Sequence, residues 1–186
     1  TWFNIEIDVD LNTNTWEVIL DGVSLGDYTA VVGQIASIDI FPVNASNGGN
    51  NNSSFYVDGD MDCVRFWDKE LTSGEVLSIA TAELNGIDMN PYIPATPFPL
   101  SNIISEYKFQ NNTLDTVGSN DGIPKDITYV AGLVGQTAVF DKNSGSNVKI
   151  PDSDNLSFGD GVTDVPFSVS FLINYDSIGN YTIFSK

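Results

Sequence analysis

The chain lacks histidine and has a single cysteine, Cys63, and a single arginine, Arg65, among its 186 residues. Without histidine, the Ser-His and Cys-His pairs that activate nucleophiles and the imidazole sites that bind zinc are excluded. One cysteine excludes an internal disulfide and a thiolate metal site. Because Cys63 lies in an apolar and aromatic stretch, we expect a buried structural thiol rather than a reactive one.

Positive charge is also scarce, since 7 Lys and Arg residues stand against 25 Asp and Glu residues, for a net charge of −18. Nucleic-acid binding needs basic patches that neutralise phosphates, so no nucleic-acid partner is expected. No apolar run is long enough to span a bilayer, and no basic-plus-apolar signal opens the chain, so no membrane insertion is expected. High acidity fits solubility and divalent-cation binding.

Strand signals dominate what is present. In residues 3–11, apolar side chains alternate with Asn4, Glu6, Asp8 and Asp10, which predicts a strand with one buried and one solvated face. Asp21-Gly22 predicts a tight hairpin turn after a strand at 15–20. Further strands are predicted at 36–43, 54–57, 63–67, 104–109, 136–140, 147–150, 167–173 and 181–184.

One helix is predicted, and it follows Thr72. Thr72 and Glu75 form a capping box, in which each side chain can bond to the backbone N–H of the other residue. The apolar stripe expected at helical spacing consists of Val76, Leu77, Ala80 and Leu84. Residues 85–99 hold four of the eight prolines and predict an extended linker, because proline fixes φ and removes a donor.

Two groups of motifs follow one another in an unexpected order. Residues 105–122, SEYKFQNNTLDTVGSNDG, and 127–186 contain a first strand, an Asp-x-x-Gly loop, a Gly-x-x-Gly-Gln-x-x-x-Phe strand and the strand PFSVS. Residues 1–22, TWFNIEIDVDLNTNTWEVILDG, and 55–76, FYVDGDMDCVRFWDKELTSGEV, contain a Trp-led strand, an Asp-Gly hairpin, late strands and a helix start. Residues 105–122 and 127–186 resemble the opening half of a laminin G-like domain, which belongs to the concanavalin A-like jelly rolls. Residues 1–22 and 55–76 resemble its closing half. The closing half therefore comes before the opening half in this chain.

The resemblance implies an all-β, antiparallel jelly-roll β-sandwich with one short helix. Residues 1–84 would form a closing half, 85–99 a Pro-rich linker and 100–186 an opening half. Two arrangements are open. In the first, called the window, the chain runs from the middle of one domain to the middle of the next in a tandem array. In the second, the two halves complete one another, either as a circular permutant or between neighbouring chains. The few strands that family members carry between the two halves are missing here, which counts against a clean permutant. Each half alone would leave an open sheet edge, which counts against the window.

Glu6-Ile7-Asp8-Val9-Asp10 is similar to the catalytic strand of jelly-roll β-glucanases. Alternate residues of a strand face the same way, and retaining hydrolysis needs two carboxyls about 5 Å apart. Asp10 stands where those enzymes have glutamate, and a turn follows at once. We therefore expect a solvated strand face and no enzymatic activity.

Two acidic stretches, 58–62 and 115–122, could bind calcium. Cys63 and Lys69 stand where an EF-hand requires Gly and Glu, so that motif is excluded. In laminin G-like relatives a structural calcium often joins the Asp-x-x-Gly loop to an aspartate near the domain end. The resemblance therefore implies a Ca2+ site that requires the halves to meet, with plain polar turns as the alternative. Its ligands would be Asp115, Asp121, Asp60 and Asp62.

Exposed aromatic side chains would form a sugar platform, because their faces stack on the apolar faces of pyranose rings. Trp16 and Tyr28 flank the Asp-Gly hairpin and are the candidates, whereas Trp2 and Trp67 fit a core. Asp160 and Asp164 lie in a Gly-rich loop that could form a sugar-facing rim or hold a cation. The alternative for them is a connecting loop.

The resemblance implies a non-catalytic glycan-binding or adhesion module of an extracellular, cell-surface or virion-surface protein. Its partners would be glycans or cell-surface polysaccharide, and neighbouring modules or copies. The alternative is a structural spacer or assembly unit of a fibre, filament or virion without a ligand of its own, and a glycoside hydrolase is a further competitor. Because a fold does not identify a ligand, the decision between them rests on the surface.

Overall fold

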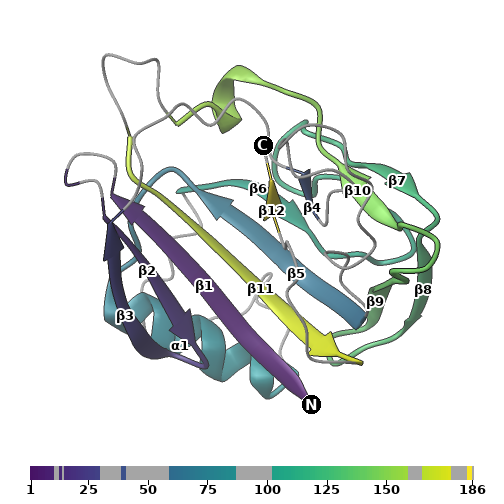
Figure 1. The fold of residues 1–186 in the computed structure, drawn as a ribbon, viewed down its shortest axis with the longest axis horizontal. Helices are drawn as coiled ribbons and strands as arrows, with labels where there is room; N and C mark the ends of the chain where they lie inside the picture. Colours follow the sequence, from purple (N-terminus) through teal and green to yellow (C-terminus); the bar gives the residue numbers. More distant parts are fainter. Residues whose placement is uncertain are drawn as a thin grey trace.

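A computed structural model describes residues 1–10, 13, 15–29, 39–40, 59–86, 102–158, 165–176 and 184–185, with the backbone alone for 39–40 and 184–185. Helix α1 spans Ser73–Leu84, and a short 3-10 helix covers Asp154–Leu156. The strands are β1 (Trp2–Asp10), β2 (Thr15–Leu20), β3 (Val23–Thr29), β4 (Asp39–Ile40), β5 (Gly59–Trp67), β6 (Ile103–Tyr107), β7 (Ile123–Lys125), β8 (Thr128–Ala131), β9 (Gln136–Phe140), β10 (Asn147–Lys149), β11 (Phe167–Tyr175) and β12 (Phe184–Ser185) (Figure 1).

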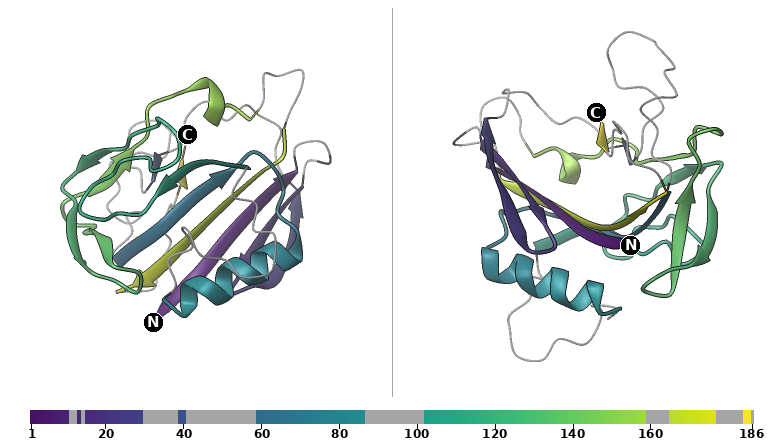
Figure 2. Two further views of the ribbon diagram at one scale, coloured as in Figure 1. Left: turned by 180° about the vertical axis from the view of Figure 1, so that it is seen from behind. Right: turned by 60° about the horizontal axis from the view of Figure 1, so that its bottom comes forward.

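Two antiparallel sheets contain these strands. The larger has eight strands, in the order β3-β2-β1-β11-β5-β9-β8, with β6 also paired to β5. The smaller has four, in the order β12-β4-β10-β7. Figure 2 shows α1 against one side of the larger sheet, at the end formed by β1, β2 and β3, and β4 and β12 on the other side. The predicted antiparallel β architecture is confirmed, and it is consistent with an all-β sandwich.

Both long segments of the chain contribute strands to the larger sheet. β5, from the first segment, pairs with β6, β9 and β11 from the second, and β11 also pairs with β1. Val64 lies opposite Tyr107, and Arg65 lies opposite both Glu106 and Ser170. The two segments therefore lie in one folded unit rather than in two globules.

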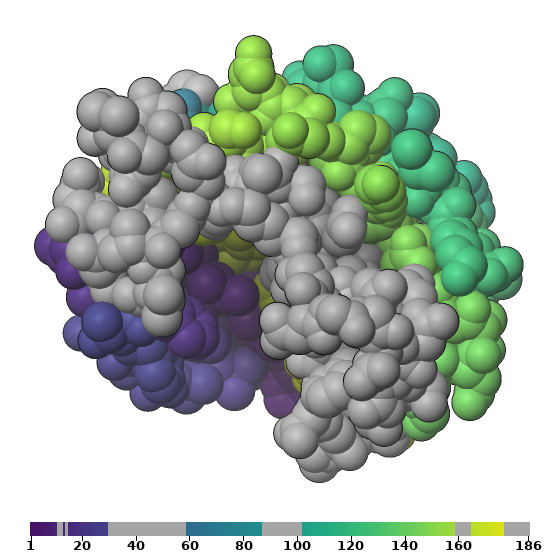
Figure 3. Space-filling view, turned by 45° about the horizontal axis from the view of Figure 1, so that its top comes forward, coloured from purple at the N-terminus to yellow at the C-terminus, as the bar shows by residue number. Residues whose placement is uncertain are grey.

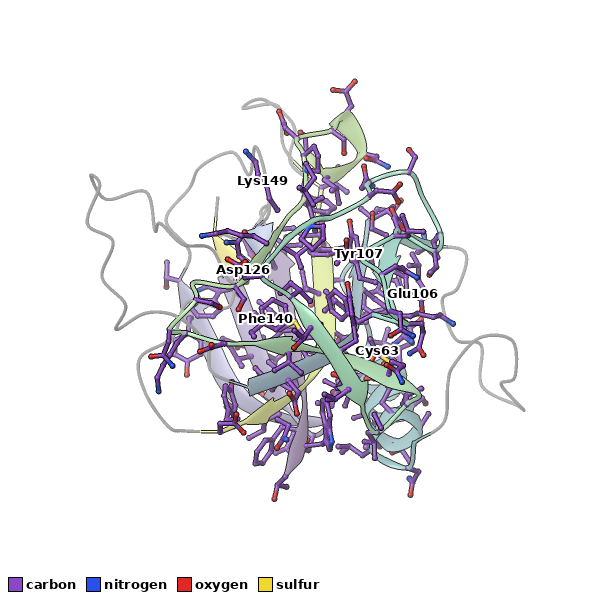
Figure 4. All side chains as sticks on the ribbon, turned by 90° about the vertical axis from the view of Figure 1, so that its right-hand side faces the viewer. Cys63, Glu106, Tyr107, Asp126, Phe140 and Lys149 are labelled. Carbon is purple, nitrogen blue, oxygen red and sulfur yellow. The ribbon has the colours of Figure 1, made fainter. Side chains whose placement is uncertain are left out.

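The main apolar core also draws on both segments. Phe66 packs edge-on against Tyr107, and Phe109 packs edge-on against Phe140, with ring centroids 6.3 Å apart in each pair. In Figure 4, Tyr107 and Phe140 lie among the side chains in the middle of the molecule, whereas Lys149 lies towards the outside. Full burial of a phenylalanine contributes about 1.5–3 kcal/mol, so these contacts stabilise the union of the segments.

The β2–β3 hairpin forms where Asp21-Gly22 predicted it. Both residues have positive φ, 51° and 78°, as a type I′ turn requires. The Asp21 carboxylate accepts a hydrogen bond from the Asn4 backbone N–H at 2.8 Å. A Cβ at Gly22 would lie 3.0 Å from Leu77 Cδ1, so glycine also lets the hairpin approach α1 closely.

Helix α1 begins at the predicted capping box, which is confirmed: the Glu75 N–H donates to Thr72 Oγ1, and the Thr72 N–H donates to Glu75 Oε2 at 2.8 Å. The predicted apolar stripe is wrong in part, because Leu77 is 55% exposed. The helix turns a different face to the sheet, since Glu83 is anchored there by Arg65. The buried residues of this face are Val76, Ile79, Ala80 and Glu83.

The prediction of a solvated polar face on β1 is wrong. Asn4 and Glu6 are 0% exposed and Asp8 is 4% exposed, whereas the alternating apolar side chains of the strand are only partly buried. Helix α1 is the reason, because it covers the polar face: Asn4 Nδ2 donates to Glu83 Oε2 at 2.8 Å. Alternation along a strand cannot show that a helix some 70 positions later will cover its polar side.

Candidate functional site

Trp16 and Tyr28, the predicted platform residues, lie side by side. They face each other across β2 and β3, with ring centroids 4.8 Å apart and ring planes inclined by 32°. Trp16 also pairs with Val9 of β1, which alternates with the helix-facing Asp8, so both rings lie on the face opposite α1. Tyr28 is 45% exposed and Trp16 is half-buried. The pair is therefore a rigid aromatic surface that solvent reaches.

Hydroxyl and carboxylate groups gather at the same end of these strands. Thr13 Oγ1 donates to Asp10 Oδ2 at 2.7 Å and lies 2.7 Å from Thr15 Oγ1. Thr15 pairs with Asp10 on one side and with Thr29 on the other. Because Asp10 and Thr15 alternate with Val9 and Trp16, they point to the α1 side of the sheet, whereas the aromatic pair lies on the other side.

Strands β1, β2 and β3, which carry the aromatic pair, contribute no positive side chain. Residues 1–29 include no Lys or Arg and six acidic residues: Glu6, Asp8, Asp10, Glu17, Asp21 and Asp27. The segment 102–158 provides the lysines at 108, 125, 142 and 149. In Figure 3, β1 to β3, in purple and blue, lie across the molecule from this teal and green segment. A polyanion would therefore be repelled at the aromatic pair.

β3 forms one edge of the larger sheet and is interrupted by a bulge. Its register against β2 shifts between Glu17 and Ile19, and Gly26 has a φ of 116°. The Gly26 N–H donates to Ser24 Oγ at 3.1 Å. Because bulges and charged side chains hinder pairing with a further strand, this edge is poorly suited to strand addition.

Asp115, a predicted calcium ligand, organises the loop that follows β6. Its carboxylate accepts hydrogen bonds at 2.8–3.1 Å from the Ser105 hydroxyl and from the N–H groups of residues 106, 117, 118 and 120. Burial alone would raise the pKa of Asp115, but these backbone donors outweigh it and hold the pKa below its usual value. Asp121 is exposed and accepts from the Asp115 N–H at 3.0 Å. The loop is therefore held by its own protein donors.

Asp62 and Asp60 lie on β5, away from this loop. Asp62 is fully buried, and its Oδ1 accepts from the Cys63 N–H at 2.8 Å. Burial raises the pKa of Asp62 to about 7. The Asp115 carboxylate accepts hydrogen bonds from Ser105 and Glu106 of β6. Glu106 pairs with Arg65, which is three residues beyond Asp62 on β5. At about 3.3 Å per residue, Asp115 therefore lies roughly 10 Å from Asp62 along the strand. The structure thus does not bring Asp62 and Asp115 to one point.

Calcium binding by these aspartates stays a prediction. Within the described ranges, no group of three or more His, Cys, Asp or Glu side chains is arranged to hold a metal ion. Asp160 and Asp164 lie outside the described residues. A calcium titration followed by thermal unfolding checks the prediction, because an ion that binds only the folded state raises the melting temperature.

Asp115→Ala should lower the free energy of unfolding by about 2–4 kcal/mol at neutral pH, because several buried backbone N–H groups lose their acceptor. The lowered pKa means that this contribution is present above the pKa of the unfolded chain and is lost as the pH falls through the folded value. Urea unfolding at pH 7 and at acid pH measures both effects. Asp121→Ala is the control, and an equal loss in both variants would contradict the role assigned to Asp115.

Beneath α1 lies a buried ionic cluster that sequence reasoning missed. Arg65, only 1% exposed, donates from Nε to Glu106 Oε1 at 2.6 Å and from Nη1 to Glu83 Oε1. Burial lowers the pKa of Arg65, but the charges of Glu83 and Glu106 raise it by more, so the guanidinium stays charged. The one arginine of the chain, set between the apolar residues Val64 and Phe66, was the signal that could have revealed this cluster.

Cys63 lies beside this cluster and is buried, as predicted, at 2% exposure. Figure 4 shows Cys63 and Glu106 on the side of the molecule where β5 and β6 meet. Burial raises the pKa of the Cys63 thiol, with the charge of Arg65 acting in the opposite direction. A thiol kept neutral in this way is a structural side chain rather than a nucleophile.

Glu6 and Asp8 complete the polar layer beneath α1. Burial and the charge of Asp8 raise the pKa of Glu6 to about 10, and burial raises the pKa of Asp8 to about 6. Both carboxyl oxygens of Glu6 are buried without a hydrogen-bond partner. The two carboxyls lie between a sheet and a helix rather than in an open cleft, which does not suit the hydrolysis of a polysaccharide.

Comparison with protein-family models, with curated proteins and with solved structures gave no match. Among the described helices, none has the length and apolar character that crossing a membrane requires.

Proposed function

We propose that this chain is a non-catalytic glycan-binding module with a concanavalin A-like β-sandwich fold, from a protein exposed on a cell or virion surface. The Trp16–Tyr28 pair is the observation on which this proposal rests. Its rings lie 4.8 Å apart on the face opposite α1, fixed by a cross-strand register and open to solvent. Rigid, partly exposed aromatic side chains give a large contact area at low entropic cost.

The negative charge around the Trp16–Tyr28 pair favours uncharged sugars as ligands. Residues 1–29 offer no Lys or Arg to bind a sulfate, a phosphate or a uronic acid. Asp10 and Thr15 point to the α1 side of the sheet, so sugar hydroxyls would meet these acceptors and donors only around the strand ends. A chain of neutral pyranose rings, with one ring stacked on Trp16 or Tyr28, fits this chemistry.

Trp16→Ala should weaken binding to neutral polysaccharides by at least about tenfold, as removal of a central aromatic contact typically does. Calorimetric titration with soluble β-glucan, mannan and galactan measures the effect, and heparin tests the exclusion of polyanions. Tyr129→Ala, a partly buried aromatic on β8, is the matched control and should leave affinity unchanged. Equal affinity of the Trp16 variant and the native chain, or no binding to any neutral glycan, would contradict the proposal.

A second function, that of an assembly unit, is favoured by apolar side chains on β3. Val23 is 64% exposed and lies opposite Leu20, which pairs with Ile5, and Leu25, in the bulge of β3, is 56% exposed. Contact between copies through these residues would remove apolar surface from water. Sedimentation at rising concentration tests it: self-association that Leu25→Lys abolishes and Trp16→Ala preserves would favour assembly over glycan binding.

A further inference from the structure

Glu6 and Asp8 form a close pair of carboxyls with almost no contact with water. They are two residues apart on β1, point to the same side of the strand, and are 0% and 4% exposed. Asn4, which precedes them on this side, reaches Glu83 of α1, so the pair lies beneath the helix. Across the sheet, Glu6 pairs with Ser170 and Asp8 with Ser168 of β11, and neither serine carries a charge.

Negative charge is in excess around this pair. The charged groups that act on it are Glu17 of β2, Glu70 before the helix and Glu83 of α1. Around Glu83 lie in turn Arg65, Asp62 and Cys63 of β5 and Glu106 of β6. Arg65 is the one cation among them, and it directs Nε to Glu106 and Nη1 to Glu83. Neither Glu6 oxygen has a hydrogen-bond donor within reach when both carboxyls are ionised. A proton on one of the two carboxyls supplies the missing donor.

We propose that Glu6 and Asp8 share one proton beneath α1, and that this proton holds the helix against the sheet until alkaline pH removes it. With the proton in place, Glu6 donates to Asp8 and the pair carries one negative charge. Without it, two buried carboxylates face each other beside Glu83, which belongs to the helix itself. Like charges in a buried site repel strongly, and opening of the helix lets water solvate them.

The direction of the pH effect follows from the raised pKa of Glu6, about 10 against 4.5 in the unfolded chain. Such a group contributes its full stabilisation below the unfolded value and loses it as the pH rises through the folded value. Asp8 and Asp62, with pKa values raised to about 6 and about 7, act in the same direction over a lower range. Between pH 7 and pH 9, loss of the Glu6 proton is therefore the main change that weakens the contact of α1 with the sheet.

Hydrogen exchange of the α1 amides on the native chain tests this proposal. The opened population should rise about tenfold per pH unit, and the protection factors of α1 should therefore fall about a hundredfold from pH 7 to pH 9. In Glu6→Gln, whose amide imitates the neutral acid, protection should be nearly independent of pH over this range. Asp27→Asn, a change at an exposed acid on β3, should keep the native dependence.

An unchanged pH slope in Glu6→Gln would overturn the proposal. If that variant does not fold, the carboxyl carbon shift of Glu6, followed by 13C NMR in the native chain, gives the answer directly. A neutral Glu6 carboxyl at pH 7 supports the shared proton, and an ionised one overturns it.

Discussion

Replacing Arg65 with methionine should lower the free energy of unfolding by about 3–5 kcal/mol at neutral pH, because removal of one partner leaves buried charges without compensation. Glu83 and Glu106 would both lose the guanidinium that they contact, and both are almost fully buried. Urea unfolding followed by fluorescence measures the loss. A further change of Glu83 to glutamine should restore part of it, since one of the two uncompensated charges is then removed.

The matched control is Lys69→Met, which breaks the ion pair between Lys69 and Glu75. This pair is partly exposed, so its loss should cost about 1 kcal/mol or less. Each variant removes one cation and adds the same side chain. A difference between their losses in free energy of unfolding therefore reports the burial of the Arg65 ion pairs rather than the loss of an ion pair alone. A loss in Arg65→Met no larger than in Lys69→Met would contradict the role assigned to the buried cluster.

Trp67→Ala should lower the free energy of unfolding by a similar amount, about 3–5 kcal/mol, as deletion of a buried aromatic side chain typically does. Trp67 is 0% exposed and belongs to the apolar cluster between the sheet and α1. The partners in this cluster are Ile19, Leu71, Val76, Ile79 and Ile103. Thermal and urea unfolding measure the change, and binding to a neutral glycan should persist where the variant is folded.

Trp16→Ala should have the opposite effects, a small loss of stability and a large loss of glycan binding. Trp16 is half-buried and its main aromatic contact is Tyr28, so its loss should cost only about 1–2 kcal/mol of stability. Its effect on glycan binding should be large. If Trp16→Ala destabilised the chain as much as Trp67→Ala, Trp16 would be a core residue and the proposed platform would fail.

Features set by local chemistry could be predicted from the sequence. The Asp21-Gly22 turn, the capping box of Thr72 and Glu75, and the strands Thr15–Leu20 and Gln136–Phe140 occur as expected. Each depends on residues a few positions apart. The contact between Trp16 and Tyr28 does not belong with these features, because a bulge sets it: the register next to the turn would pair Trp16 with Asp27, and the shift after Glu17 brings Tyr28 opposite Trp16 instead.

Features set by contacts between distant segments could not be predicted in this way. Asn4, Glu6 and Asp8 alternate with apolar residues as a solvated face would, and only the position of α1 shows that they are buried. A plain polar turn was likewise the alternative to a calcium site for residues 58–62, but Gly59 begins the buried strand β5. In the structure a Cβ there would lie 2.2 Å from the Asn174 carbonyl oxygen, so glycine is needed where β5 and β11 meet.

The union of the two segments in one sheet is the central claim, and cross-strand NOEs measured on the monomeric protein test it most directly. We predict backbone contacts between Val64 and Tyr107, and between Arg65 and Ser170, as the antiparallel registers of β5 with β6 and β11 require. Their absence from a folded monomer, with the strands of 1–84 and 100–186 each in contact only within their own segment, would contradict the account.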